Sequence, residues 1–221
     1  MSEFGFVRLD GCMADDLSVV NSARVSFAQS SEELDDKAKG LINFLMRERH
    51  GTPFEHNSFR FHVKCPLFVA REWFRHRIGS FNEFSARYSF VEDDFFAPEK
   101  KHVRTQAGKP GAYKFEPVEE QLAEHAILHI EEVNAYCYEA YQQLVEKGVA
   151  KELARVVLPV SMYTQFYWTV NARALMNFLS LRNHDAAQID IRLYAKEVEE
   201  IFKGQMPATY DAWINNARVA P

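Results

Sequence analysis

The stretch Phe59–Arg77, FRFHVKCPLFVAREWFRHR, holds both kinds of secondary structure from which this fold is built. Over its first seven residues apolar side chains alternate with Arg, His and Lys, which predicts a half-buried strand over 59–65. Pro66 suits the first position of a helix, because that position needs no backbone N–H donor. A helix is therefore expected over Leu67–Arg77.

Hydrophobic spacing and capping residues predict further elements on both sides of this stretch. On the N-terminal side these are a strand over 6–12, a helix that Asp15 caps and that ends near Val25, and a helix over Glu33–Arg49. On the C-terminal side an irregular segment is expected over 78–115, with one or two short strands and a Thr105–Gly111 loop. It is followed by a long helix over Pro117–Lys147, a short helix over 149–157 and a strand over Met162–Val170. The last three elements are a helix that Asn171 caps and that ends at Leu181, a helix from an Asp185 cap to Phe202 with Gly204 beyond it, and a final helix that begins with Pro207. Since no repeat or linker interrupts this order, residues 1–221 are interpreted as a single α+β domain in which helices predominate.

The composition is that of a globular protein. Of the 221 residues, 47% are hydrophobic and 26% are charged, which excludes a wholly disordered chain. No apolar run approaches the ~18 residues that span a bilayer, and the N-terminus lacks the pattern of a secretory signal. A cytoplasmic location without a membrane partner is therefore expected. Cys12, Cys65 and Cys137 are widely separated and odd in number, which indicates reduced thiols and no metal site.

Charge is distributed unevenly along the chain, whose formal net charge is −5. Residues 60–88 carry six Arg and Lys residues against two Glu, whereas residues 115–146 carry eight Glu and no Arg or Lys. The acidic segment is typical of a solvated helix face. The chain lacks the broad basic surface that nucleic acids need, so no nucleic-acid partner is expected. A small, multiply anionic ligand fits the Arg-rich segment better, because the guanidinium fork suits phosphate and carboxylate.

The segment Arg75–Tyr88, RHRIGSFNEFSARY, concentrates polar and charged side chains without a helical or strand period. Such a density of donors and acceptors indicates ligand contact. The segment resembles, at all nine specified positions, the R-H-R-x-x-S-x-N-E-x-S-x-R-Y signature of the flavin-dependent thymidylate synthases. Four further segments are similar to blocks of that family: His50–His56 (HGTPFEH), Phe59–Phe74 (FRFHVKCPLFVAREWF), Ala154–Pro159 (ARVVLP) and Trp168–Phe178 (WTVNARALMNF).

The resemblance implies both a fold and an activity. The family fold mixes helices with a mainly antiparallel sheet. Its members convert dUMP to dTMP for de novo dTTP biosynthesis, with 5,10-methylenetetrahydrofolate as the carbon donor, tightly bound FAD as the hydride carrier and NADPH as the reductant of the flavin. They are homotetramers whose active sites lie at subunit junctions. The chain therefore resembles a methyltransferase with these ligands and this assembly.

The resemblance also implies roles for individual residues. Arg182 matches a catalytic arginine that lies against the uracil and stabilises negative charge at N3 and its neighbouring carbonyl. Thr52 and Arg155 would each reach a ligand bound by another subunit. The residues implied to bind FAD are Thr52, Arg75, His76, Arg77, Glu83, Asn171, Arg173 and Asn177. Those implied to bind dUMP are Glu72, Arg75, Glu83, Phe84, Ser85, Ala86, Arg87, Arg155 and Arg182.

Several roles stay open at this point. Glu72 stands where some family members have Gln, and a carboxylate is unfavourable beside a phosphate. His50 suits a cation at a helix C-terminus as well as a folate or flavin contact, and His184 is a candidate to replace a family histidine. Ser85 has no base fixed near it, so a phosphate contact is favoured over a nucleophilic role. Cys65 lies in an alternating strand, which favours a core thiol over a covalent catalyst.

Two rival functions belong to other classes. One is a nucleotide-binding or RNA-binding module without catalysis, which bound flavin in the purified protein would exclude. The other is a different flavoenzyme, such as an oxidase, which release of tritium from dUMP labelled at C5 would exclude.

Overall fold

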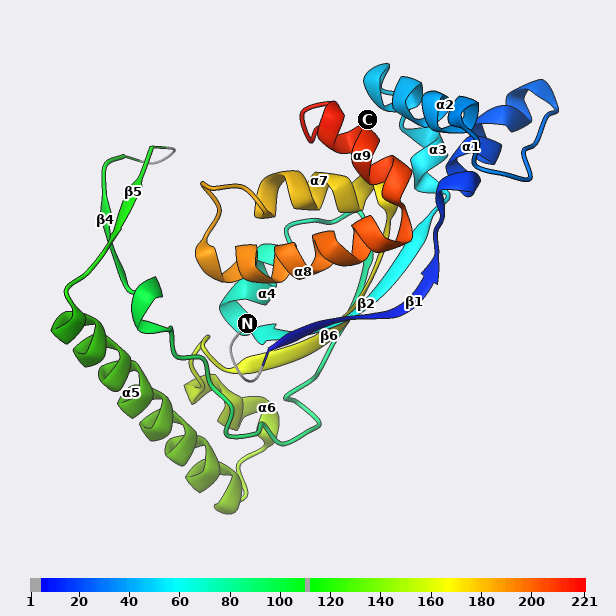
Figure 1. Cartoon of the computed structure of the whole chain (residues 1–221). Helices are drawn as coiled ribbons and strands as arrows, with labels where there is room; N and C mark the ends of the chain where they lie inside the picture. Colours follow the sequence, from blue (N-terminus) through cyan, green and yellow to red (C-terminus); the bar gives the residue numbers. More distant parts are fainter. Residues whose placement is uncertain (1–4, 110–111) are drawn as a thin grey trace. The chain divides into compact units, whose positions relative to one another are not determined.

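A computed structural model describes the chain at residues 5–109 and 112–221 (Figure 1). Helices predominate over strands, as predicted. The strands form a four-stranded sheet in the order β1 (Phe6–Met13), β2 (Ser58–Pro66), β6 (Tyr163–Asn171) and β3 (Ser80–Glu83), and a two-stranded sheet of β4 (Arg104–Ala107) and β5 (Lys114–Pro117).

The central strands β2 and β6 run antiparallel. The Leu67 N–H donates to the Met162 carbonyl at 2.8 Å just beyond one end of the pair. Nearer the middle, the rings of His62 and Tyr167 stack with centroids 4.8 Å apart. Residue numbers thus fall along β2 as they rise along β6. Since β4 and β5 are also antiparallel, the predicted mainly antiparallel sheet is confirmed.

Two compact units divide the chain, and β2, β3 and β6 each contribute residues to both. The prediction that residues 1–221 form a single domain stays a prediction. The α7 unit contains Phe6–Val63, Glu72–Asn82 and Phe166–Pro221, and the α5 unit contains Lys64–Arg71 and Glu83–Gln165.

The core of the α7 unit is aromatic. Trp73, Trp168 and Phe178 are fully buried, and the Phe178 ring lies 4.8 Å from that of Trp73 and 5.0 Å from that of Trp168. Helices α7 (Ala172–Arg182) and α8 (Ile189–Gln205) lie side by side, and α8 packs on β1 (Figure 1). Burial of large rings contributes strongly to stability, so α7 is held firmly against the sheet.

Shorter helices complete the α7 unit. The buried carboxylate of Asp16 accepts hydrogen bonds from the backbone N–H groups of Ala208 and Thr209, at 2.9 and 2.8 Å. An anion is favoured there because it faces the positive end of a helix dipole, and the contact joins the first and last of these helices. Their bounds are α1 (Asp16–Arg24), α2 (Asp36–Arg47), α3 (Thr52–Glu55) and α9 (Pro207–Asn215).

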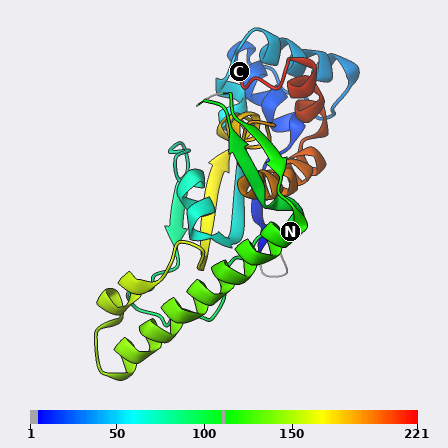
Figure 2. The same cartoon turned by 90° about the vertical axis from the view of Figure 1, so that its left-hand side faces the viewer.

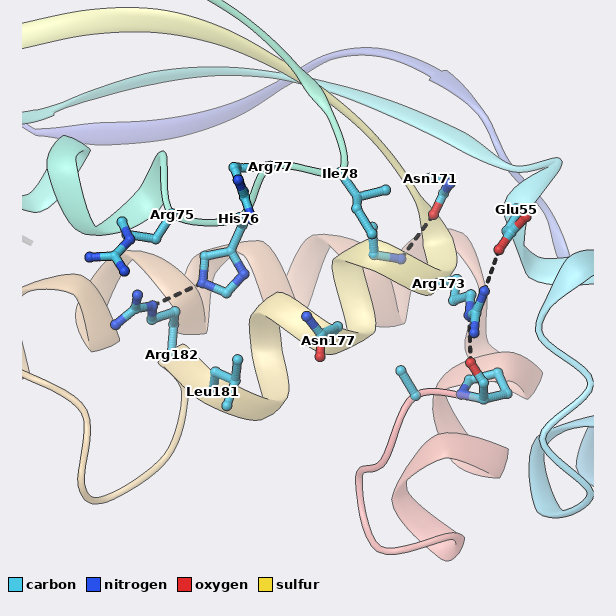
Figure 3. A pocket seen from close by; sticks show the side chains of 13 residues that line it. Glu55, Arg75, His76, Arg77, Ile78, Asn171, Arg173, Asn177, Leu181 and Arg182 are labelled. Carbon is cyan, nitrogen blue, oxygen red and sulfur yellow. Dashed lines mark hydrogen bonds and ion pairs between the residues drawn. The ribbon is translucent and has the colours of Figure 1, made fainter. Parts of the chain in front are cut away.

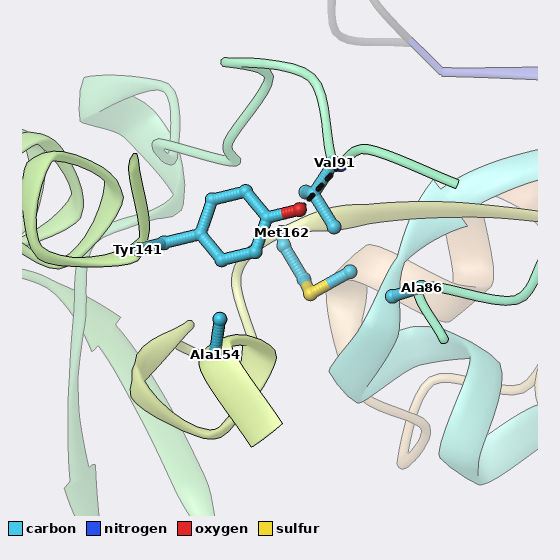
Figure 4. Packing of buried hydrophobic residues seen from close by; sticks show 5 residues of the cluster. All are labelled: Ala86, Val91, Tyr141, Ala154 and Met162. Carbon is cyan, nitrogen blue, oxygen red and sulfur yellow. Dashed lines mark hydrogen bonds between the residues drawn. The ribbon is translucent and has the colours of Figure 1, made fainter. Parts of the chain in front are cut away.

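The α5 unit is organised by one long helix, α5 (Glu120–Glu146). The β4–β5 hairpin joins the N-terminal end of α5 (Figure 2). Toward its other end, α5 contacts α6 (Lys151–Ala154) and the 3-10 turn Arg155–Val157. The Tyr141 hydroxyl accepts from the Val91 N–H at 3.2 Å. The buried cluster beneath this contact consists of Ala86, Val91, Tyr141, Ala154 and Met162 (Figure 4).

Three predicted helix starts are confirmed. Asp15 caps α1, with its carboxylate accepting from the Ser18 N–H at 2.6 Å. Asn171 caps α7 by accepting from the Ala174 N–H at 2.8 Å. Pro207 is the first residue of α9.

The predicted helix over Leu67–Arg77 begins at Leu67, as predicted, but Pro66 is not its first residue and it ends before Arg77. Pro66 ends β2, where a residue without an N–H is tolerated. Helix α4 (Leu67–Trp73) then stops early, because the N–H groups of Arg75 and His76 bond three residues back in a tight turn. The signature segment therefore begins outside the helix.

Four other predicted features also differ from the structure. The Thr105–Gly111 loop is partly strand β4, with Pro110 and Gly111 outside the described residues, and α5 starts after Pro117 because β5 pairs through that residue. Asp185 does not cap α8; its carboxylate pairs with Arg192 instead. Gly204 lies within α8, not beyond it.

Candidate active site

A cavity of about 590 Å³ lies within the α7 unit, and we call it the larger cavity. One wall is the segment that follows α4, and the other is one face of α7 (Figure 3). Residues four apart on a helix share a face, which brings Arg173, Asn177 and Leu181 to the same wall. The lining residues are Glu55, Arg75, His76, Arg77, Ile78, Asn171, Arg173, Ala174, Asn177, Leu181, Arg182, Ala220 and Pro221.

Arg173 is held by groups that are distant in sequence. Its Nη1 forms an ion pair with Glu55 at 2.5 Å, and its Nε donates to the Pro221 carbonyl at 2.5 Å (Figure 3). Gly51 leaves room for the side chain, since a Cβ there would lie 2.5 Å from the Arg173 Nε. This close approach explains why a glycine precedes Thr52.

Arg182 occupies the opposite end of α7. A cation is favoured there by the negative end of the helix dipole. Its guanidinium donates to the Glu72 carboxylate and to His76 Nε2, both at 3.0 Å. Burial, with a smaller contribution from Arg182, lowers the pKa of His76 to about 4. His76 is therefore neutral near pH 7 and can accept this hydrogen bond.

Arg75 and Arg77 differ from these two arginines. Both are exposed and line the larger cavity. Within the described residues neither forms an ion pair. Their charges are therefore available to an anionic ligand.

A smaller cavity of about 260 Å³ lies within the α5 unit. Glu83 lines it and accepts a hydrogen bond from the Thr164 hydroxyl at 2.8 Å. Ser85 and Arg87 continue the same loop, and the Ser85 hydroxyl accepts from the Arg87 N–H at 3.4 Å. The residues around it are Leu67, Glu83, Phe84, Ala86, Arg155, Val156, Leu158, Met162 and Thr164.

The predicted site residues thus gather in two places. The larger cavity collects Arg182 and most of the predicted FAD contacts: Arg75, His76, Arg77, Asn171, Arg173 and Asn177. The smaller cavity collects predicted dUMP contacts: Glu83, Phe84, Ala86 and Arg155. Thr52 is exposed on α3, and among the described residues it lines neither cavity.

Sequence reasoning missed Gly51, which makes room for Arg173, and six residues that line the larger cavity: Glu55, Ile78, Ala174, Leu181, Ala220 and Pro221. Gly51 and Glu55 lie in the HGTPFEH segment, so their place in that motif was the available signal. Ala220 and Pro221 offered none, because small apolar residues carry no mark of a ligand site. Cys65 is fully buried, and burial raises its thiol pKa well above the usual value, so a reactive thiolate is disfavoured.

Comparison with known proteins shows the family of the chain. The family model described as "Thymidylate synthase complementing protein" matches residues 9–208. A flavin-dependent thymidylate synthase of Thermosipho africanus is 49% identical, over 96% of this chain and 92% of that protein. That of Thermotoga neapolitana is 46% identical, over 96% and 92% of the two chains. The chain belongs to the flavin-dependent thymidylate synthases. The predicted family and enzyme class are confirmed.

Solved structures give the same fold for this family member. A UMP/dUMP methylase, PolB from Streptomyces cacaoi, bound with 5-Br UMP, has a TM-score of 0.92 and 41% sequence identity, covering 98% of this chain and 96% of that one. The same protein bound with 5-Br dUMP has a TM-score of 0.91. Within the described residues, no helix has both the length and the apolar character needed to cross a membrane.

Proposed function

We propose that the chain catalyses the reductive methylation of dUMP to dTMP in de novo dTTP biosynthesis. In this proposal FAD is the tightly bound cofactor, 5,10-methylenetetrahydrofolate donates the carbon, and NADPH reduces the flavin. The observation that carries the proposal is the larger cavity, where arginines from two segments converge within an acidic family member. Family membership supplies the reaction class.

The larger cavity fits FAD. Arg75 and Arg77 have charges available, and Arg173 is already oriented by Glu55, so a diphosphate can be neutralised without a glycine loop. The side-chain amides of Asn171 and Asn177 add hydrogen-bonding groups that suit a flavin or ribityl chain. Bound flavin would supply the hydride, and the protein residues would position the substrate and polarise its uracil ring.

The residues around the smaller cavity fit a nucleotide phosphate. Ser85, Arg87 and the backbone N–H of Ala86 can donate to it, and Arg155 adds a charge. The backbone N–H of Phe84 already donates to the Gln165 carbonyl at 2.8 Å, so Phe84 would contribute contact without this donor. Glu83 is held by Thr164 and would contact both ligands. Arg182 would stabilise the negative charge that develops on the uracil, the kind of electrostatic effect that dominates many enzymes.

A homotetramer with active sites at subunit junctions completes the proposal. Thr52 and Arg155 are exposed in the single chain, as residues that serve a neighbouring subunit must be. Leu153 and Val156, beside Arg155, are 63% and 73% exposed. Large apolar side chains gathered on a surface are typical of an interface. The proposed assembly acts in the cytoplasm.

The test combines flavin content with turnover. The purified protein should show a flavin absorbance spectrum, and it should release tritium from dUMP labelled at C5 when the folate and NADPH are supplied. UMP is the informative second substrate, because PolB is described as a UMP/dUMP methylase. Flavin-loaded protein that releases tritium from neither nucleotide would contradict the proposal.

A further inference from the structure

Glu72 resembles a nucleotide contact of the family, but its place in the structure indicates another task. It lies near the C-terminal end of α4, and its side chain is 26% exposed. Among the described residues, Arg182 and His76 line the larger cavity and Glu72 does not. Glu72 therefore contacts Arg182 from outside the lining of that cavity.

The contacts of Arg182 form a clamp. Its Nη1 donates to the Glu72 carboxylate at 3.0 Å, its Nη2 donates to the Glu72 backbone carbonyl at 3.1 Å, and its Nε donates to His76 Nε2 at 3.0 Å. All three nitrogens of the planar guanidinium thus have an acceptor. Because Glu72 contributes two of the three bonds, it fixes both the position and the plane of the group.

The charge states around the clamp are consistent with this role. Burial raises the pKa of Glu72, Arg182 opposes that rise and Asp190 adds to it. The pKa of His76 is lowered to about 4, so in neutral solution its unprotonated Nε2 can accept the hydrogen bond from the Arg182 Nε–H. A second cation at His76 would repel the guanidinium, so the clamp requires the neutral imidazole.

We propose that Glu72 is a positioning residue, which acts on the reaction by holding the Arg182 guanidinium against the cavity. This inference rests on the proposed function, because it assigns Glu72 a task through the proposed catalytic arginine. Arg182 donates hydrogen bonds to Glu72 and His76 with three of its N–H groups, and its remaining N–H groups can donate to a ligand. A direct contact between Glu72 and an anionic nucleotide would bring two like charges together, which is unfavourable.

The kinetic test is a double-mutant cycle. Glu72→Ala should lower kcat by about tenfold or more, since a displaced catalytic group is costly, while KM for dUMP changes by less than about twofold. Glu72→Gln keeps a carbonyl acceptor and should retain most of kcat. In an Arg182→Ala background, Glu72→Ala should have no further effect. An additional loss there, or a rise in KM alone, would show a direct substrate contact and overturn the proposal.

A second measurement does not depend on activity. In the NMR spectrum, the Arg182 Nε–H of the wild type and of Glu72→Gln should give a rigid signal, and that of Glu72→Ala a mobile one. Glu197→Ala, an exposed glutamate on α8, is the matched control and should change neither signal nor rate. A rigid Arg182 in Glu72→Ala would overturn the proposal even if kcat fell. If the wild type methylated no dUMP, the proposed function would fail by itself, and the NMR comparison would still decide the role of Glu72.

Discussion

Arg182 in the larger cavity donates three hydrogen bonds of 3.0–3.1 Å, whereas Arg155 in the smaller cavity donates one of 3.3 Å, to the carbonyl of Glu152. Arg87, on the loop beside it, reaches the Glu152 carboxylate at 3.4 Å, with both side chains at least half exposed. Exposed pairs of this kind contribute little. The larger cavity is thus organised before a ligand arrives, and the phosphate donors of the smaller one are still free to adjust.

The arginines of the larger cavity are well ordered because of the secondary structure that carries them. Arg182 and Arg173 belong to α7, which packs through Phe178 on buried tryptophans. Arg87 lies in a loop, and Arg155 is the first residue of a short 3-10 turn. A rigid helix holds groups to the tolerance that electrostatic catalysis needs, whereas a loop suits donors that close on a phosphate. This difference is consistent with the proposed roles, polarisation of the substrate in the larger cavity and anchoring of its phosphate beside the smaller one.

The largest expected effect comes from Arg182→Ala, which removes the best-ordered charge. We expect kcat for dUMP methylation to fall by about a hundredfold or more, because stabilisation of developing charge is lost. Flavin content should stay near that of the wild type, as measured by absorbance. Arg47→Ala, which removes an exposed arginine from α2, is the control. Wild-type turnover in Arg182→Ala would contradict the proposed catalytic role of Arg182.

A smaller effect is expected from Gly51→Ala, which displaces Arg173 without removing it. The new Cβ would lie 2.5 Å from the Arg173 Nε, so the guanidinium must move. Loss of one charge-assisted bond, about 1.5–3 kcal/mol, should weaken FAD binding by roughly tenfold or more, measured by fluorescence titration.

Gly40→Ala provides the matched control for that substitution. A Cβ at Gly40 meets no atom within 4 Å, and the residue lies inside α2. Alanine there should raise stability by up to about 1 kcal/mol, as expected in a helix interior, and leave FAD binding unchanged. Equal FAD affinity in the two variants would mean that the position of Arg173 does not matter.

The pH dependence of stability tests the His76 clamp. The pKa of His76 is about 4 in the folded chain and near its ordinary 6.5 in the unfolded one, so between these values the unfolded state binds more protons. This contribution to stability is present above about pH 6.5 and is lost as the pH falls toward 4. Melting temperatures of the wild type should therefore fall more steeply over this range than those of His76→Gln. Parallel curves would contradict a neutral, buried His76.

The smallest effect is expected from Glu152→Ala, which frees Arg87 on the loop beside the smaller cavity. The free energy of unfolding should change by less than about 0.5 kcal/mol, because the pair with Arg87 is exposed. KM for dUMP should fall by about twofold, because the Glu152 carboxylate no longer competes with the phosphate for the Arg87 guanidinium. A rise in KM would show that Glu152 orders these donors instead of competing for them.

The sequence by itself determined the kinds of elements and most of the residues that gather in each cavity. The alternation over 59–65, the caps Asp15 and Asn171 and the opening Pro207 are local signals, and they depend on neighbours within a few residues. The signature Arg75–Tyr88 is also a local signal, and it marked residues that line the two cavities.

Only the tertiary structure decided how the arginines are held. Glu55 and Arg173 are 118 residues apart, and Glu72 and Arg182 are 110 apart, so no local rule could join them. It also decided that α4 stops at Trp73, because the turn that follows places His76 beside Arg182. Such contacts are stronger where the surrounding residues exclude water and the hydrogen-bonding partners are held close together. Both conditions depend on how distant segments of the chain pack.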